Sequence, residues 1–311
     1  MRHIFCEQLI KRARKNKNVY LLTGDLGYNC FEQFIKEFPD RFINVGVAEN
    51  NMLGIGTGLA LSGKEVYIYS IIPFLIYKTL EHLRNYISAY DLNIKLIGAG
   101  GGFSYGIHGI SHNPFEDIAI LKSLPNLKIL TPGSKIETIL ALEKMFKNKG
   151  VFYIRLGKVL DYEIHKKIQK YKLGDGLIIK KGKDLTLIGS GNIIGNVMKV
   201  AKKLEKKGFS VCIINYICLK PINKKFILQK INKKSKIFCI EEHIKSGGLG
   251  SIISEILLEN NYSNLFFKKI GLLDKSHIAI GDQEFLREIN NLGVNSLEKT
   301  ILKHLNNKNS Y

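Results

Sequence analysis

Short apolar runs alternate with longer amphipathic segments along most of the chain. In the first half, runs rich in β-branched and aromatic residues predict strands, and the segments between them predict helices. The predicted strands are residues 19–22, 66–69, 94–97, 127–130 and 152–154. The predicted helices are residues 3–16, a glycine-rich helix after Glu49, and residues 75–89. Such strands, alternating with helices, are typical of a parallel sheet that is covered on both faces.

The same alternation resumes in the second half of the chain. Strands are predicted at residues 184–191, 211–214 and 237–240, with helices at 193–207, 224–231 and 249–258. The stretch between the halves, residues 158–183, is polar and lysine-rich and contains three glycines. We therefore predict an α/β protein with two doubly wound domains, residues 1–160 and 183–311, joined by a linker at 161–182.

Composition is consistent with a globular protein. The 311 residues are 45% hydrophobic and 24% charged, and they suffice for two domains with substantial cores. No signal-peptide pattern is found, and the most apolar run, residues 68–77, is too short to cross a bilayer. The five cysteines are scattered, odd in number and without a C-x-x-C pair. We expect reduced thiols, a cytoplasmic location and no membrane partner.

The net charge of +20 narrows the choice of partners only slightly. Lysines are spread along the chain in small clusters, at residues 11–17, 202–207 and 230–236, and no recognised nucleic-acid motif accompanies them. We therefore expect anionic small-molecule substrates or an acidic partner subunit, and no nucleic-acid partner.

The most informative segment is VGVAENNMLGIGTGLAL at residues 45–61. It places a single carboxylate, Glu49, at the start of an apolar helix, and acidic residues are rarely buried without a partner. Glu49 could be a first-turn residue that complements the helix dipole. Alternatively, it could be a carboxylate that binds a proton on a buried ring. The pattern by itself leaves both interpretations open.

Several separated motifs agree, in order and spacing, with one family. They are the Glu49 segment, TGDL at 23–26, YSIIPFL at 69–75, GISHNPFED at 109–117, RLGK at 155–158, LKP at 219–221 and EEHIKSGGLG at 241–250. From residue 1 to about 305, the chain resembles the C-terminal half of a transketolase, a thiamine-diphosphate enzyme. This resemblance implies a pyrimidine-binding domain followed by a transketolase C-terminal domain.

The resemblance implies a cofactor site. Thiamine diphosphate carries the difficult chemistry, and the protein must bind its aminopyrimidine ring through a carboxyl group. Glu49 is the implied catalytic residue, and its carboxyl should be poorly solvated so that it can share a proton with the ring. Phe74 is expected to stack on the ring. Ile71 and Tyr77 are expected to line the same pocket, and Asp25 is a further candidate for cofactor binding.

The resemblance also implies a substrate site. His112 matches a histidine that handles protons on the donor sugar, which suits an imidazole because it titrates near neutral pH. Arg2 and Lys158 match residues that bind the substrate phosphate, although each could also be a solvated surface charge.

Three positions depart from the family pattern. Gly100 replaces a usual histidine, His108 replaces a usual aspartate, and Asn29 stands where a serine often contacts phosphate. All three remain candidate substrate-binding positions. The changes put the usual pentose phosphates in doubt, so we expect an unusual phosphorylated ketose or an acceptor sugar that is activated by a nucleotide.

The sequence lacks the part of a transketolase that holds the cofactor's diphosphate through Mg²⁺. The family uses Gly-Asp-Gly, and GDL at 24–26 and GDQ at 281–283 lack the second glycine. No metal site is therefore expected within this chain. We expect Mg²⁺ to be held mainly by a complementary N-terminal-half subunit, in an α2β2 heterotetramer. Alternatives are the β subunit of a 2-oxoacid dehydrogenase, a deoxyxylulose-phosphate-synthase-like enzyme, and a non-catalytic partner that retains the fold.

Overall fold

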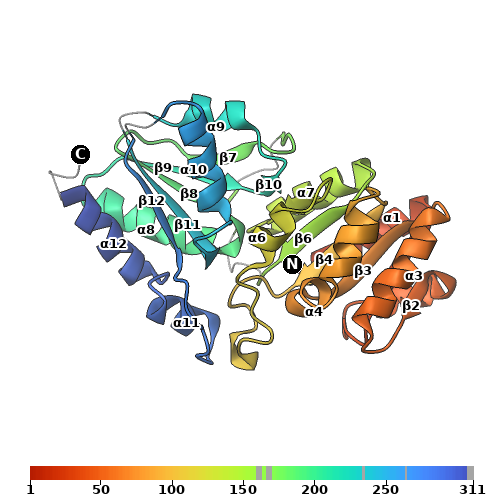
Figure 1. Cartoon of the computed structure of the whole chain (residues 1–311). Helices are drawn as coiled ribbons and strands as arrows, with labels where there is room; N and C mark the ends of the chain where they lie inside the picture. Colours follow the sequence, from red (N-terminus) through yellow and green to blue (C-terminus); the bar gives the residue numbers. More distant parts are fainter. Residues whose placement is uncertain (159–162, 166–169, 233–234, 263–264, 307–311) are drawn as a thin grey trace.

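A computed structural model of the chain consists of two α/β domains that follow one another (Figure 1). It describes residues 1–158, 163–165, 170–232, 235–262 and 265–306. The first domain is built on a seven-stranded sheet and the second on a five-stranded sheet. Most strand pairs in both sheets are parallel, which confirms the predicted fold class.

The first sheet has the strand order β10-β5-β6-β4-β3-β1-β2. β10 pairs antiparallel with β5 and comes from the second half of the chain, so it joins the two domains. The strands are β1 (Val19–Thr23), β2 (Phe42–Asn44), β3 (Glu65–Ile71), β4 (Ile94–Ala99), β5 (Lys128–Leu130), β6 (Phe152–Leu156) and β10 (Cys218–Lys220).

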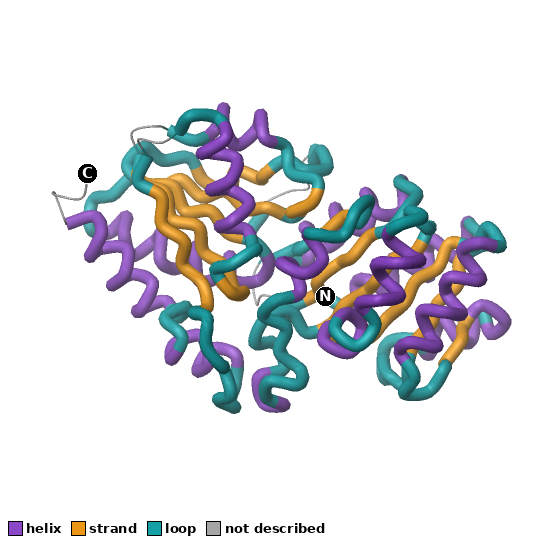
Figure 2. Tube along the Cα trace, in the orientation of Figure 1, coloured by secondary structure: helices purple, strands orange, loops and turns teal. Residues whose placement is uncertain are grey.

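Helices cover both faces of the first sheet (Figure 2). Neighbouring residues on β1, Leu21 and Leu22, are fully buried and belong to different apolar clusters, one on each face. Burial on both faces explains why the central strands are continuously apolar. The cluster that contains Leu21 includes residues of α1 (Arg2–Lys15), α2 (Glu32–Glu37) and α7 (Lys135–Lys147). The cluster that contains Leu22, on the other face, includes residues of α3 (Glu49–Leu61), α4 (Ile72–Ile76) and α6 (Asp117–Lys122).

The second sheet has the order β12-β11-β8-β9-β7, in which β7 pairs antiparallel with β9. Its strands are β7 (Gly176–Lys180), β8 (Leu185–Gly189), β9 (Val211–Tyr216), β11 (Lys236–Ile244) and β12 (Phe267–Leu272). The helices of this domain are α8 (Ile194–Lys206), α9 (Lys224–Lys230), α10 (Leu249–Glu259), α11 (Gln283–Ile289) and α12 (Val294–Asn306).

Two predicted elements differ from the structure. The helix predicted at residues 75–89 begins earlier and is broken into α4, α5 (Leu80–His82) and a π-helical turn at Leu83–Ser88. Pro73 lies in the first turn of α4, where its missing N–H costs nothing. The predicted linker is wrong at β7, an edge strand that is buried only in part. Linker residues 161–162 and 166–169 lie outside the described residues.

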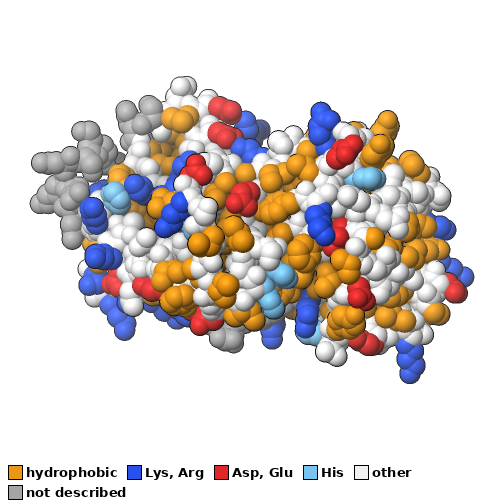
Figure 3. Space-filling model, turned by 60° about the horizontal axis from the view of Figure 1, so that its bottom comes forward, with side chains coloured by type: hydrophobic (Ala, Val, Ile, Leu, Met, Phe, Trp, Pro, Cys, Tyr) orange, Lys and Arg blue, Asp and Glu red, His pale blue; other side chains and the backbone are white. Residues whose placement is uncertain are grey.

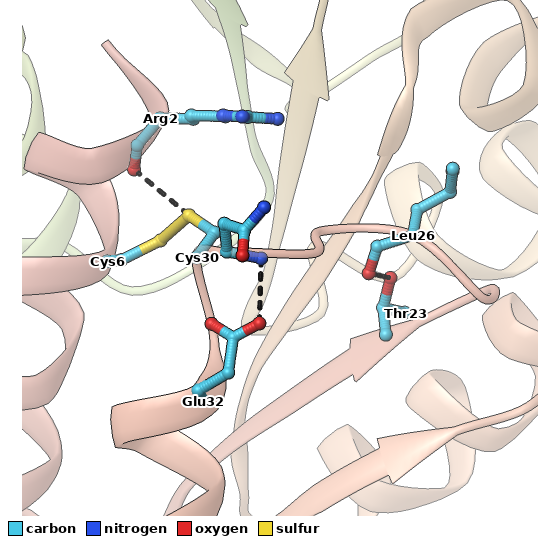
Figure 4. The surroundings of a disulfide bond; sticks show 7 residues. Arg2, Cys6, Thr23, Leu26, Cys30 and Glu32 are labelled. Atoms are coloured by element: carbon cyan, nitrogen blue, oxygen red, sulfur yellow. Dashed lines mark hydrogen bonds between the residues drawn. A yellow bond between two sulfur atoms is a disulfide. The ribbon is translucent and has the colours of Figure 1, made fainter.

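The prediction of reduced thiols is wrong for two cysteines. Cys6 on α1 and Cys30 in the loop before α2 form a disulfide, and the other three cysteines are free and buried (Figure 4). The pair is 24 residues apart and is brought together by packing of α1 beside that loop, so the cysteine spacing carried no signal. The predicted cytoplasmic location loses this support and stays a prediction.

No helix in the described part of the chain has the length and apolarity needed to traverse a bilayer.

The loop after β4, residues 100–116, is held by the second domain. The Phe103 backbone N–H donates to Oε1 of Glu242 on β11 at 2.8 Å. Arg287 on α11 donates to Oε2 of Glu242 at 2.6 Å, and both side chains are buried. Arg155 on β6 donates to Asp117 at 2.9 Å and to the Glu242 carbonyl at 3.2 Å. These bonds join the domains at the start and the end of the loop.

We predict that Glu242→Gln lowers the free energy of unfolding by about 3 kcal/mol, because it leaves the Arg287 guanidinium buried without its main counter-charge. Urea unfolding followed by circular dichroism measures this change. The matched control is Glu259→Gln, which removes the exposed Lys224–Glu259 pair and should cost less than about 1 kcal/mol. Equal, small effects of both variants would show that Glu242 does not hold the domains together.

Candidate active site

The candidate residues lie near one edge of the first sheet. Strands β1, β3, β4 and β6 run parallel, so their carboxyl ends meet there, with Thr23 paired to Tyr69 and Ala99 paired to Leu156. The chain leaves these ends towards Asp25, Phe74, Gly100 and Lys158, respectively. The carboxyl edge of a parallel sheet is where ligands bind in such folds.

Glu49 is the first residue of α3, which follows β2, and only 4% of its surface is exposed. Its Oε2 atom accepts a hydrogen bond from Nζ of Lys78 at 3.1 Å. Among the described residues, none donates to the other carboxylate oxygen. Glu49 faces a hollow of about 470 Å³, here called the Glu49 hollow, lined by Val47, Ala48, Glu49, Asn50, Asn51 and Lys78. One oxygen of a nearly buried carboxylate is thus available to a ligand.

Aromatic side chains extend from the Glu49 hollow along the sheet edge. Nζ of Lys78 lies 5.3 Å from the centre of the Phe74 ring, and Phe74 contacts His112 edge-on at 5.1 Å between ring centres. His112 also lies 4.8 Å from the His108 ring, and its Nδ1 is 3.0 Å from the Ser111 hydroxyl. Burial lowers the pKa of His112, and the neighbouring His108 lowers it further. Both effects favour the neutral imidazole.

A second hollow, of about 270 Å³, lies beside this row and is here called the Arg2 pocket. Its cationic side chains are Arg2, at the start of α1, and Lys158, after β6. The Cys6–Cys30 disulfide fastens the start of α1, and the Arg2 side chain extends away from it (Figure 4). The lining residues are Met1, Arg2, His3, Ala99, Gly100, Ser104, Tyr105, Leu156, Gly157 and Lys158. Paired cations and a hydroxyl suit an anionic group.

The structure brings the predicted residues Arg2, Gly100 and Lys158 together in the Arg2 pocket. It joins Glu49 to the row of Phe74, His112 and His108 through Lys78.

Besides Phe74, His108 and His112, four more predicted residues line neither hollow. Asp25 and Asn29 are exposed on the loop after β1, where Asp25 accepts from the Tyr28 hydroxyl at 3.0 Å. Ile71 ends β3, half-buried. The Tyr77 hydroxyl donates to Glu116 at 2.9 Å, and burial, with nearby acidic groups, raises the pKa of Tyr77. Their roles in binding stay predictions.

Two residues of the site were not predicted from the sequence. Lys78 is the partner of Glu49, and Tyr105 lines the Arg2 pocket. Lys78 follows Phe74 by four residues, which was a usable signal for a shared helical face. The signal for Tyr105 was the run of three glycines at residues 100–102, which leaves room for a bulky neighbour.

Hydrophobic side chains are exposed on the face that Figure 3 presents, with histidine side chains among them. On the segments that carry candidate residues, the large apolar side chains of Tyr28, Val47, Ile107 and Ile110 are more than half exposed. Among the described residues, no group of His, Cys, Asp and Glu is placed to hold a metal ion.

Comparisons with known proteins cover nearly the whole chain. Residues 1–160 match the family model described as "Transketolase, pyrimidine binding domain", and residues 174–284 match "Transketolase, C-terminal domain". A "putative transketolase C-terminal section" of Methanocaldococcus jannaschii is 34% identical over 280 residues, 88% of this chain and 86% of the relative. An apulose-4-phosphate transketolase subunit of Actinobacillus succinogenes is 31% identical over 95% of both chains.

A solved structure described as "split gene transketolase, inactive beta4 tetramer" is similar over almost its entire length. The TM-score is 0.85 at 28% sequence identity, and the match covers 98% of this chain and 97% of that chain. The two-domain arrangement is therefore shared with a separately encoded transketolase polypeptide.

Proposed function

We propose that this chain, which belongs to the transketolase family, is the subunit that carries the catalytic glutamate of a split transketolase. The enzyme acts on an unusual phosphorylated ketose. The observation that carries the proposal is the nearly buried Glu49 carboxylate, which faces a hollow at the sheet edge and has one oxygen to which no described residue donates. The dehydrogenase, synthase and non-catalytic alternatives receive less support, because the two relatives described above are named as a transketolase section and a transketolase subunit.

The residues present fit the pyrimidine end of thiamine diphosphate. When bound, this cofactor supplies a carbon nucleophile that can carry a two-carbon ketol unit. Glu49 would hold a proton at the ring nitrogen through its free oxygen, and its burial would keep water from competing for that bond. Phe74 would pack against the ring, and its edge contact with His112 would fix the imidazole beside the reacting centre.

The diphosphate end needs a partner. The described residues offer no cluster for Mg²⁺, whose ligands would be carboxylate, amide and phosphate oxygens. We propose that a complementary subunit supplies this half and covers the exposed apolar side chains of Tyr28, Val47, Ile107 and Ile110. An α2β2 assembly would give two such interfaces. The similar solved structure, described as an inactive β4 tetramer, supports inactivity of this subunit on its own.

The Arg2 pocket is the proposed site for the anionic end of the substrate. Arg2 and Lys158 provide the charge, and the net charge of +20 would attract anions at long range. His112, largely neutral, would accept or donate a proton on the sugar hydroxyl. Between the two predicted substrate types, the phosphorylated ketose is favoured, because an apulose-4-phosphate transketolase subunit is among the relatives.

We predict that the isolated chain binds thiamine diphosphate weakly or not at all, because its residues contact only one end of the cofactor. Isothermal titration in the presence of Mg²⁺ tests this, first with the chain alone and then with the co-purified complementary subunit. Binding should appear only with the partner. Tight, Mg²⁺-dependent binding to the chain alone would contradict the division of the site between two subunits.

We predict that Glu49→Gln slows proton–deuterium exchange at the thiazolium carbon by more than a hundred-fold in the reconstituted enzyme. An amide can hydrogen-bond the ring but cannot exchange a proton with it. Nuclear magnetic resonance measures the exchange directly, and Glu81→Gln, an exposed residue of α5, is the control. Unchanged exchange in Glu49→Gln would leave Glu49 as a helix-end carboxylate only.

We predict that His108→Asp shifts activity towards ordinary ketose phosphates, because it restores the group that the family usually has at this position. The measurement is kcat/KM for xylulose 5-phosphate with ribose 5-phosphate, in wild type and variant. An increase of about ten-fold is expected, the effect of one hydrogen bond to a sugar hydroxyl. If the wild type already uses this pair at ordinary transketolase rates, the unusual-ketose proposal is wrong.

A further inference from the structure

Gly100 and Tyr105 depend on each other sterically. Gly100 follows β4 with φ +93°, a conformation that side chains rarely adopt. A Cβ atom at this position would lie 2.3 and 2.4 Å from Cδ2 and Cε2 of the Tyr105 ring. The ring therefore fills the space that a side chain at position 100 would need. This is the position where the family pattern has a histidine.

Tyr105 lies where it can contact a substrate. It lines the Arg2 pocket together with Arg2 and Lys158, and its ring centre is 6.4 Å from that of His112. Within the described part of the chain, no group hydrogen-bonds to its phenol oxygen. Tyr105 thus connects the proton-transfer histidine to the cationic pocket.

The phenol of Tyr105 belongs to a polar cluster. Tyr69, at the carboxyl end of β3, is almost fully buried. Burial, together with the nearby Tyr105 hydroxyl, raises the pKa of Tyr69 to about 12, and the Arg2 guanidinium opposes this rise. Tyr69 is thus a neighbour of both Tyr105 and Arg2, which line the pocket.

We propose that Tyr105 is a specificity-determining residue that takes over the place of the missing histidine. This inference rests on the proposed function and deepens it. The phenol hydroxyl donates to the anionic end of the substrate beside Arg2 and Lys158, while its ring forms one wall of the pocket. A phenol donates one hydrogen bond and carries no positive charge, whereas an imidazole can carry one. Gly100 is required because only glycine leaves room for this ring.

The kinetic test uses Tyr105→Phe in the enzyme reconstituted with its partner subunit. The readout is the ratio of kcat/KM for a phosphorylated aldose acceptor to that for uncharged glycolaldehyde. We expect this ratio to fall about ten- to a hundred-fold, mostly through KM, since a hydrogen bond to a charged group is lost. Tyr90→Phe, an exposed tyrosine, is the matched control. An unchanged ratio in Tyr105→Phe would overturn the proposal.

A binding test does not depend on activity. Inorganic phosphate is titrated against the wild-type chain and Tyr105→Phe, with resonance shifts as the readout. Binding at least three-fold weaker in the variant supports the proposal; equal binding, or none to wild type, overturns it. If phosphate binds as expected but wild-type enzyme transfers no ketol unit, the proposed function fails and the role of Tyr105 in anion binding stands.

The steric coupling is tested by thermal unfolding of single and double variants. Gly100→Ala should lower the melting temperature, and the loss should be smaller in a Tyr105→Leu background, because the clash with the ring is then relieved. Part of the loss should persist, since the positive φ is strained for alanine. Additive effects of the two substitutions would overturn the coupling between positions 100 and 105.

Discussion

The carboxylate of Glu242 is buried at the junction of the two domains, where water cannot solvate its charge. Arg287 supplies the counter-charge and the Phe103 backbone supplies a further donor. Removing a partner of such a buried charge is strongly destabilising. Because one of these partners is the Phe103 backbone, the loop at residues 100–116 is fixed relative to the second domain. That loop carries Tyr105 and the two site histidines. The second domain thus positions the site although it lines neither hollow.

The candidate site lies at one edge of the first sheet. The parallel strands β1, β3, β4 and β6 bring their carboxyl ends to this edge, and the segments that follow them carry the candidate residues. The Glu49 hollow and the Arg2 pocket lie along this edge, linked by contacts through Phe74, His112 and Tyr105. In the proposed function, proton transfer and anion binding are the tasks of this chain, whereas the oxygen ligands for the metal and the diphosphate come from a complementary subunit.

The proposed anion-binding pocket depends on how the N-terminal helix is held in place. Arg2 lies in the first turn of α1, whose apolar face packs through Phe5 and Leu9 into the core. One turn further, Cys6 bonds to Cys30 in the loop that also carries Asn29. Covalent attachment and burial together limit the freedom of the helix start. These restraints keep the start of the helix beside the pocket, and no acidic residue in the described part of the chain forms an ion pair with Arg2.

The sequence by itself determined the two α/β domains, because strands that are buried on both faces must be apolar throughout, and helices between them must be amphipathic. It also made Glu49 a candidate, since a lone acid before an apolar helix is unusual, but the pattern left its role open and only the resemblance to transketolases implied a catalytic one. Tertiary structure alone decided the pairings between distant residues. Glu242 contacts a backbone group 139 residues away, and no local pattern encodes such a distance.

The same reason applies to the smaller pairings. Lys78 reaches Glu49 across 29 residues, and Cys6 reaches Cys30 because two separate elements pack together. The edge strand β7 was not predicted because its short apolar run, residues 177–179, lies among lysines and glycines that are typical of a linker. Even Tyr105, only five residues from Gly100, was decided in three dimensions: the positive φ of the glycine turns the chain so that the ring closes over it. The spacing of apolar residues along the chain indicates which positions are buried, whereas contacts between distant side chains depend on how the helices and strands pack together.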